Sequence, residues 1–449
     1  MTRHANQAPQ PGGPYTAQDA QRAVIHEGFE RHRVRPRRIG EGRTVGSADG
    51  VDFLFEEGTI LVREEYFGRV RVVLAELGML PRDRGRRPFS ERGVLPADRD
   101  RRDFSEPVIA GVSLVRLDRG NRPSDVLAAL DAIRTFVGPN AAAPNLVFSI
   151  TGNAAGCPAV EPEPMPAGSA PHPGYTSNRC AGEGVKVVVV DTGYDEPATQ
   201  RSSWLRGVDG DPDYAISGDI LSHYAGHGTF IAGVIRCVAP LAEVHVRKVF
   251  EFGGAATEAD LVRALDQVLE CDHPDIISMS AGTYAYDASG PLTFPFFNAH
   301  RLSHHKGVVM VVAAGNDDDR KPFWPAAAPY TVSVGALGTH WKGKAGFSNH
   351  GGWVDVYAPG QDLVNAFPVG TYTYREPPHV PPFAEKTRVE KFYGMAMWSG
   401  TSFSTPLVAG LIAARMSRTG ENGRDAAAAL IAEAQGAAQP GVGAVLLPE

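Results

Sequence analysis

Residues 185–193 read VKVVVVDTG, an apolar run that ends in a carboxylate side chain. Such a run is typical of a strand that is buried on both faces of a parallel sheet. Further apolar or β-branched runs follow at 244–249, 276–280, 308–313 and 330–334. Helical patterns separate these runs, over 229–238 and from about 258 to 269, where Thr257 is the expected capping residue. This alternation predicts an α/β fold built on a doubly wound, mostly parallel sheet.

Three polar side chains lie at the ends of predicted strands or helices. Asp191 directly follows the strand at 185–190, where sheets of this kind collect their active groups. His227 lies between two glycines at the mouth of the predicted helix, and Ser402 precedes an apolar helical run at 406–416. A serine hydroxyl becomes a nucleophile when a base such as histidine takes its proton, and a buried carboxylate orients that base. The residue types therefore suit a nucleophilic site.

The motifs that carry these residues stand in one particular order. They read DTG at 191–193, GHGT at 226–229 and GTSFSTP at 400–406, with SMSAG at 278–282 and AAGN at 313–316 between them. The order Asp, His, Ser separates the subtilisin arrangement from the chymotrypsin and α/β-hydrolase orders. With these motifs in this order, the chain resembles the subtilase family of serine peptidases over about 183–416.

The resemblance implies a serine endopeptidase that hydrolyses polypeptide substrates through an acyl-enzyme. It assigns the nucleophile to Ser402, the general base to His227 and the orienting carboxylate to Asp191. Asn316 would donate a hydrogen bond to the oxyanion, together with the backbone N–H of Ser402. The expected substrate-binding residues are Ser280, Ala281, Gly282, Gly253 and Gly254.

Four segments are expected along the chain. Residues 1–51 are polar and rich in Pro, Gly and Arg, which predicts a loosely ordered segment. Residues 52–150 carry patterns of at least three strands and two helices, which predict a small α+β domain. Residues 151–182 are rich in Pro, Gly and Ala and are expected to form a linker, followed by a subtilisin-like domain over 183–449.

The N-terminal part has two interpretations. Subtilases are commonly made with an α+β propeptide that blocks the cleft, so the resemblance implies an inhibitory domain over 52–150. Self-processing would then cut the chain within 150–182. A permanent regulatory or docking domain is the competing interpretation.

Two other functions stay open. The same site could pass its acyl group to an amine, as a peptide-processing transpeptidase or macrocyclase does, with the aromatic and proline-rich stretch at 371–392 excluding water. A non-enzymatic peptide-binding module is the third interpretation, and the complete set of Asp191, His227, Asn316 and Ser402 argues against it.

Composition limits the partners and the cofactors. A net charge of −7 gives no reason to expect nucleic acid, and no stretch approaches the roughly 18 apolar residues of a membrane span. Without a recognisable secretory signal, we expect a cytoplasmic location, with export by another route left open. No cofactor and no metal are expected, because 235–240 runs straight into the next strand and leaves no room for the usual calcium loop of the family. Unpaired thiols are the expected state of the four cysteines, and Cys157 and Cys180 are the best candidates if a disulfide forms.

Overall fold

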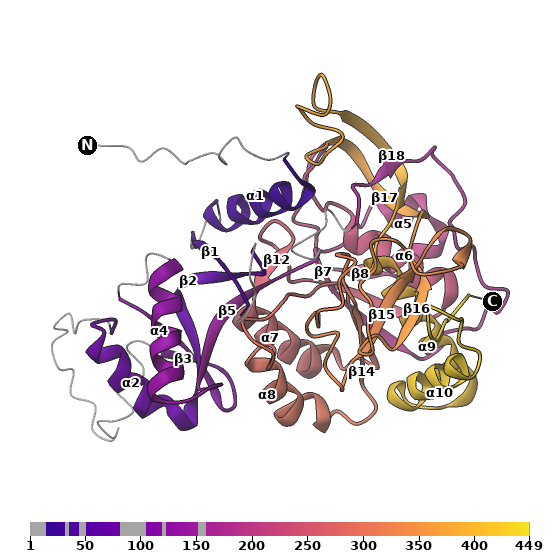
Figure 1. The fold of residues 1–449 in the computed structure, drawn as a ribbon. Coiled ribbons are helices and arrows are strands. Elements are labelled where there is room, and N and C mark those ends of the chain that lie inside the picture. Colours follow the sequence, from indigo (N-terminus) through magenta and orange to yellow (C-terminus); the bar gives the residue numbers. More distant parts are fainter. Residues whose placement is uncertain are drawn as a thin grey trace, which may run out of the picture.

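The computed structural model describes residues 15–31, 36–44, 51–80, 105–118, 123–150 and 159–448. These residues form two units that lie side by side in Figure 1, an N-terminal unit within 15–150 and a C-terminal unit within 159–448. Their sheets meet, because one strand of the C-terminal unit extends the sheet of the N-terminal unit.

The C-terminal unit is built on a seven-stranded sheet whose neighbouring strands are all parallel. The four valines at 187–190 lie in β7, between β13 and β11, and are fully buried. A strand covered on both faces needs such a continuous apolar run. The predicted mostly parallel α/β sheet is therefore confirmed. Its order is β16 (Val356–Pro359), β15 (Val332–Leu337), β14 (Val309–Ala313), β13 (Ile276–Met279), β7 (Lys186–Asp191), β11 (Glu243–Lys248) and β8 (Asp209–Gly210).

Two long helices and two shorter ones position the site. Helices α6 (His227–Val238) and α9 (Thr401–Thr419) pack against each other and against the sheet. Helices α7 (Glu258–Gln267) and α8 (Thr293–His300) pack together beside the N-terminal unit. The predicted cap of α7 is confirmed, since the Thr257 side chain accepts the N–H of Asp260 at 3.3 Å. The remaining helices of this unit are α5 (Ala198–Arg201) and α10 (Gly423–Gly436).

A second, five-stranded sheet contains the long hairpin that rises at the top of Figure 1. Its order is β6 (Glu163–Pro164), β18 (Val389–Trp398), β17 (Leu363–Thr373), β10 (Ile220–Leu221) and β9 (Ile216–Ser217). Strand β6 falls within the predicted linker, so the linker prediction is wrong for 159–182. The composition hid this docking, because what holds the segment is main-chain pairing with the edge of β18 and the buried side chain of Glu161.

The N-terminal unit is an α+β structure, as predicted. The helices among its described residues are α1 (Ala17–Glu30), α2 (Phe67–Glu76) and α4 (Pro123–Phe136). Its sheet has six strands, and the outermost of them, β12 (Ala255–Thr257), comes from the C-terminal unit. The other five are β5 (Ala142–Ser149), β2 (Phe53–Arg63), β4 (Val112–Arg116), β3 (Ser105–Ile109) and β1 (Ile39–Gly42).

The prediction of a loosely ordered segment over 1–51 is wrong for 15–31 and 36–44. Helix α1 starts with a complete capping box between Thr16 and Asp19 and buries one face. That face carries Ala20, Val24, Ile25 and Phe29, at the spacing that brings side chains to one side of a helix. The surrounding Arg, Gln and His residues mask this pattern in the composition.

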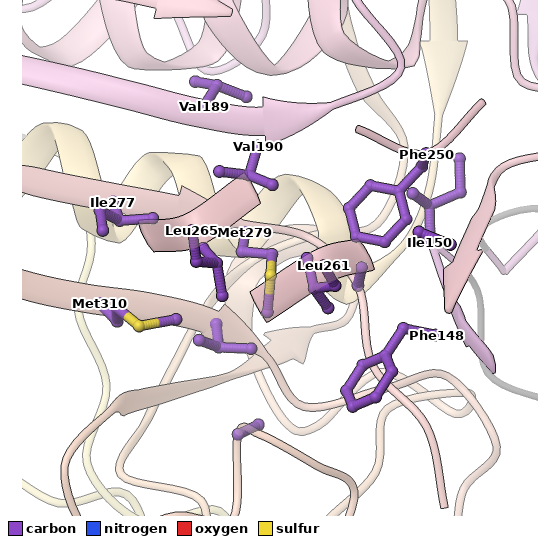
Figure 2. Close-up of a cluster of buried hydrophobic side chains, with 14 of the residues drawn as sticks. Phe148, Ile150, Val189, Val190, Phe250, Leu261, Leu265, Ile277, Met279 and Met310 are labelled. Carbon is purple, nitrogen blue, oxygen red and sulfur yellow. The ribbon is translucent and has the colours of Figure 1, made fainter. Parts of the chain in front are cut away.

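One hydrophobic core runs through both units. Phe148 and Ile150, from the end of the N-terminal unit, belong to the same buried cluster as Phe250, Leu261 and Met279 of the C-terminal unit (Figure 2). The N-terminal unit thus shares its hydrophobic core with the C-terminal unit and is not packed as a separate domain.

Candidate active site

The predicted acid and base meet at the carboxyl end of β7. Asp191 is the last residue of that strand, and His227 is the first residue of α6. His227 Nδ1 lies 2.8 and 2.9 Å from the two carboxylate oxygens of Asp191, and both side chains are fully buried. The carboxylate can therefore fix the tautomer that leaves Nε2 as the basic nitrogen.

Aromatic side chains fix the plane of the imidazole. The ring centroid of His227 lies 5.6 Å from that of Trp398, edge to face, and 5.5 Å from that of Phe403. Because these rings are themselves buried, the imidazole has little freedom to turn away from Asp191.

The predicted nucleophile lies in the first turn of α9, one residue inside the helix. The Ser280 hydroxyl donates to the backbone carbonyl of Ser402 at 2.8 Å and so anchors this turn. Ser402 Oγ donates to the carbonyl oxygen of Ile150 at 3.3 Å. His227 Nε2 has no hydrogen-bond partner among the described residues, so the hydroxyl here is turned toward Ile150 and not toward the base.

Asn316 follows β14 and faces the same turn. Its side-chain oxygen accepts the Thr401 N–H and the Thr401 hydroxyl, each at 2.9 Å. These two bonds fix the amide oxygen of Asn316 to the residue that precedes Ser402.

The last residues of the N-terminal unit form a strand between two segments of the C-terminal unit. On one side the Ile150 N–H donates to Gly254 O at 3.0 Å, and β12 pairs antiparallel with 147–149. On the other side Ser149 and Gly282 exchange both backbone hydrogen bonds, at 3.0 and 2.9 Å. An extended peptide held on both edges in this way presents the carbonyl of Ile150 to Ser402.

The predicted substrate-binding residues have different surroundings. Gly254 and Gly282 contact the backbone of this strand, whereas the side chain of Ser280 holds Ser402. Gly253 packs under α1, where a Cβ atom would lie 2.5 Å from the carbonyl oxygen of Val24. Ala281 is buried in the core.

Sequence reasoning missed two groups at this site. Ile150 ends the apolar run LVFSI directly before a glycine-rich stretch, and that junction was the available signal. Asp213 lies in no motif, and only the folded chain brings it beside Thr192 and Gly226.

In the described parts of the chain, no group of three or more His, Cys, Asp or Glu residues could hold a metal ion. Helix α6 runs without interruption to Val238, and the absence of a calcium loop stays a prediction. Cys180, Cys237 and Cys271 are free thiols, and Cys157 lies outside the described residues, so no bridge of Cys180 is found.

Comparisons with known proteins identify the family. The sequence model of the subtilase family matches residues 182–443. An intracellular serine protease of Paenibacillus polymyxa is 30% identical over 258 residues, 53% of this chain and 68% of that protein. A cuticle-degrading serine protease of Arthrobotrys oligospora is 33% identical over 275 residues, 58% of each chain. A cold-adapted subtilisin-like serine proteinase of known structure has 23% identity and a TM-score of 0.45, over 61% of this chain and 92% of that one.

The chain therefore belongs to the subtilase family, and its enzymatic class is that of a subtilisin-like serine endopeptidase. It covers 68% and 58% of the lengths of the two curated relatives. No helix in the described ranges is both long and apolar enough to cross a membrane, and the expected cytoplasmic location stays a prediction.

Proposed function

We propose that this chain is a serine endopeptidase made as a self-inhibited precursor, and that it cleaves itself between Ile150 and Thr151. The observation that carries the proposal is the hydrogen bond of 3.3 Å from Ser402 Oγ to the carbonyl of Ile150. The flanking backbone pairs with Gly254 and Gly282 support it, since they hold the strand as a substrate would be held.

The chemistry follows from the geometry of three side chains. Ser402 rotates toward His227, whose Nε2 takes the hydroxyl proton as Oγ attacks the carbonyl carbon of Ile150. The C–N bond to Thr151 breaks, and the imidazolium returns its proton to the departing amine. Water then attacks the acyl-enzyme with the same histidine as base, which releases the Ile150 carboxylate and restores Ser402.

Charge that develops on the carbonyl oxygen needs donors in place before the reaction. Asn316 suits this role, because its oxygen is bound to Thr401, directly before Ser402, which leaves its NH₂ group as the donor. The backbone N–H of Ser402 lies in the first turn of α9, where main-chain donors have no partner within the helix. No cofactor enters these steps.

The N-terminal unit acts in this proposal as the inhibitor of the precursor. Strand β5 fills the cleft, and His227, Asp191 and Ser402 are at most 1% exposed, so a second polypeptide has no access. Helix α1 adds a separate contact at the rim of the cleft. The Tyr224 hydroxyl donates to Gln21 Oε1, and Phe29 stacks on Phe252 with ring centroids 4.4 Å apart.

Intact-mass spectrometry of the purified full chain tests the proposal. Wild-type protein should convert into fragments 1–150 and 151–449 whose masses sum to the chain plus one water. Ser402→Ala should stay intact, whereas Ser404→Ala, a change to a buried serine of the same motif, should still convert. Wild-type protein that stays intact while it hydrolyses added peptides would show that self-processing is wrong. Products without the added water would instead show acyl transfer to an amine.

A fluorophosphonate probe tests the assignment of the nucleophile separately. It should label the wild-type chain after conversion and leave Ser402→Ala unlabelled. Equal labelling of both proteins would assign the reactive serine elsewhere.

A further inference from the structure

Asp213 is a buried carboxylate outside the proposed catalytic set. It lies between β8 and β9 and is only 7% exposed. Its Oδ1 accepts the Ala215 N–H at 2.9 Å, and its Oδ2 accepts the Gly226 N–H at 2.8 Å. The Thr192 hydroxyl also lies 3.5 Å from Oδ2. Backbone and hydroxyl donors thus hold this carboxylate at a position where its charge is poorly solvated.

Two of these three donors come from the segments that carry the proposed acid and base. Gly226 directly precedes His227, and Thr192 directly follows Asp191. The Thr192 N–H also donates to Asp191 Oδ1 at 2.8 Å, and its hydroxyl lies 3.2 Å from the same oxygen. Asp213 therefore joins the backbone before the histidine to the residue after the aspartate.

Close packing around Asp213 leaves little room for its backbone to move. Gly193 has a φ of +113°, and a Cβ atom there would lie 2.7 Å from Asp213 Cα. Gly226 has a φ of +79° and starts α6 without a side-chain cap, so the bond from its N–H to Asp213 defines where the helix begins. A shift of Asp213 would be passed on to the imidazole of the next residue.

We propose that Asp213 is a positioning residue for the peptidase reaction, which holds the start of α6 so that the His227 ring stays aligned between Asp191 and Ser402. This inference rests on the proposed function of the site. Among the described residues, the hydrogen bonds of Asp213 go to Thr192, Ala215 and Gly226 and not to the substrate strand or Ser402, so Asp213 acts through His227.

The charge of Asp213 adds a second effect. The charged groups that face it are Asp191 and Asp195, and Asp195 is paired with Arg201. Burial, and after it the negative charges of Asp191 and Asp195, raise the pKa of Asp213 to about 7. Because Asp213 is therefore ionised mainly near and above pH 7, removing its charge should alter the pH–rate profile in that range.

Asp213→Asn in the full chain tests both effects at unchanged side-chain size. An NH₂ group replaces one accepting oxygen, so either Ala215 or Gly226 loses its acceptor. We expect the first-order rate of cleavage at Ile150 to fall by roughly 10- to 100-fold, because small misplacements of a base are costly. The pH–rate profile should also lose the change near pH 7 that the ionisation of Asp213 contributes in the wild type.

The matched control is Asp209→Asn, whose exposed side chain pairs with His245 in the same region and should leave rate and profile unchanged. Thr192→Val is a second variant, which removes the hydroxyl between the two carboxylates and should slow cleavage by a smaller factor. If Asp213→Asn and Thr192→Val, both folded by circular dichroism, match the wild type in rate and in profile, the proposal is overturned.

A measurement that needs no activity separates this proposal from the function it rests on. The proton NMR signal of His227 Nδ1–H is identified by its loss in His227→Ala. It should shift or broaden in Asp213→Asn and stay in place in Asp209→Asn. A wild-type chain that never cleaves would refute the proposed function, and an unshifted signal in Asp213→Asn would refute the role of Asp213.

Discussion

The affinity of the N-terminal unit for the C-terminal unit should fall as pH rises, because the buried carboxyl of Glu258 ionises. This first residue of α7 is fully buried, and its Oε2 has no hydrogen-bond partner in the described part of the chain. Strand β5 covers this helix end, since the Ala259 N–H donates to Asn145 Oδ1 at 3.0 Å. Burial is the largest cause that raises the pKa of Glu258 from 4.5 to about 7, against opposing hydrogen bonds from Thr293 and from the backbone of Leu146 and Leu292.

The size of the effect follows from these values. A pKa difference of this size between the complex and a fully exposed carboxyl corresponds to roughly 3 kcal/mol. The two bonds from Thr293, at 2.7 and 2.8 Å, stay within the C-terminal unit after β5 leaves, so only part of this energy belongs to binding. Binding should be strongest below pH 4.5, where the carboxyl is protonated in both states. It should weaken about tenfold as pH rises through 7.

The affinity can be measured on fragments 1–150 and 151–449 that are co-expressed as separate chains, with the Ser402→Ala substitution in the second fragment. The Kd is determined at fixed ionic strength between pH 5 and 8.5, and Glu258→Gln should flatten its pH dependence. The control is Glu270→Gln, whose exposed side chain pairs with Arg301 beyond the same helix. If Glu258→Gln keeps the full pH slope of the parent pair, the reasoning is refuted.

Three further changes test single contacts. Asn316→Ala should slow self-cleavage by roughly 10²–10³, the loss measured for such a donor in subtilisin, with an unchanged unfolding midpoint; a rate within threefold of the wild type would contradict this. Gly254→Ala should destabilise the chain by about 1–3 kcal/mol, because φ is +72° and the new Cβ would meet the Tyr224 ring; unaltered urea unfolding would contradict it. Phe29→Ala should cost about 3–5 kcal/mol and speed the release of the N-terminal fragment, whereas Phe136→Ala, at a 69% exposed ring, should do neither.

The central sheet could be predicted from the sequence because its signal is local. The valines of β7 are buried on both faces, and Asp191 comes directly after them in the one place where a parallel sheet exposes its strand ends. His227 and Ser402 were found for a similar reason, since each lies in a short glycine-containing motif that begins a helix. The motif alone was enough to locate them.

The parts that the sequence did not predict depend on partners far along the chain. Strand β6 forms because β18 offers it an edge, and its own residues Glu163 and Pro164 have low strand preference. Asp213 has no sequence signal either, because its role comes from backbone donors at Ala215 and Gly226 that only the fold brings together. Helix α1 had a readable pattern, which the polar composition around it obscured.

The connection between Ile150 and Ala159 has a consequence for how inhibition would end. Ile150 is held at Ser402, and the Ala159 N–H is bound to the carbonyl of Ser399 at 3.3 Å. While the chain is whole, the proposed inhibitor and the enzyme are one molecule, and the local concentration of that inhibitor would be on the order of millimolar at any dilution. A cut after Ile150 removes none of the contacts of α1 or β5, but it turns a unimolecular equilibrium into a bimolecular one. The activity of the cleaved protein would then depend on its concentration. The N-terminal fragment would stay bound at high concentration and dissociate on dilution.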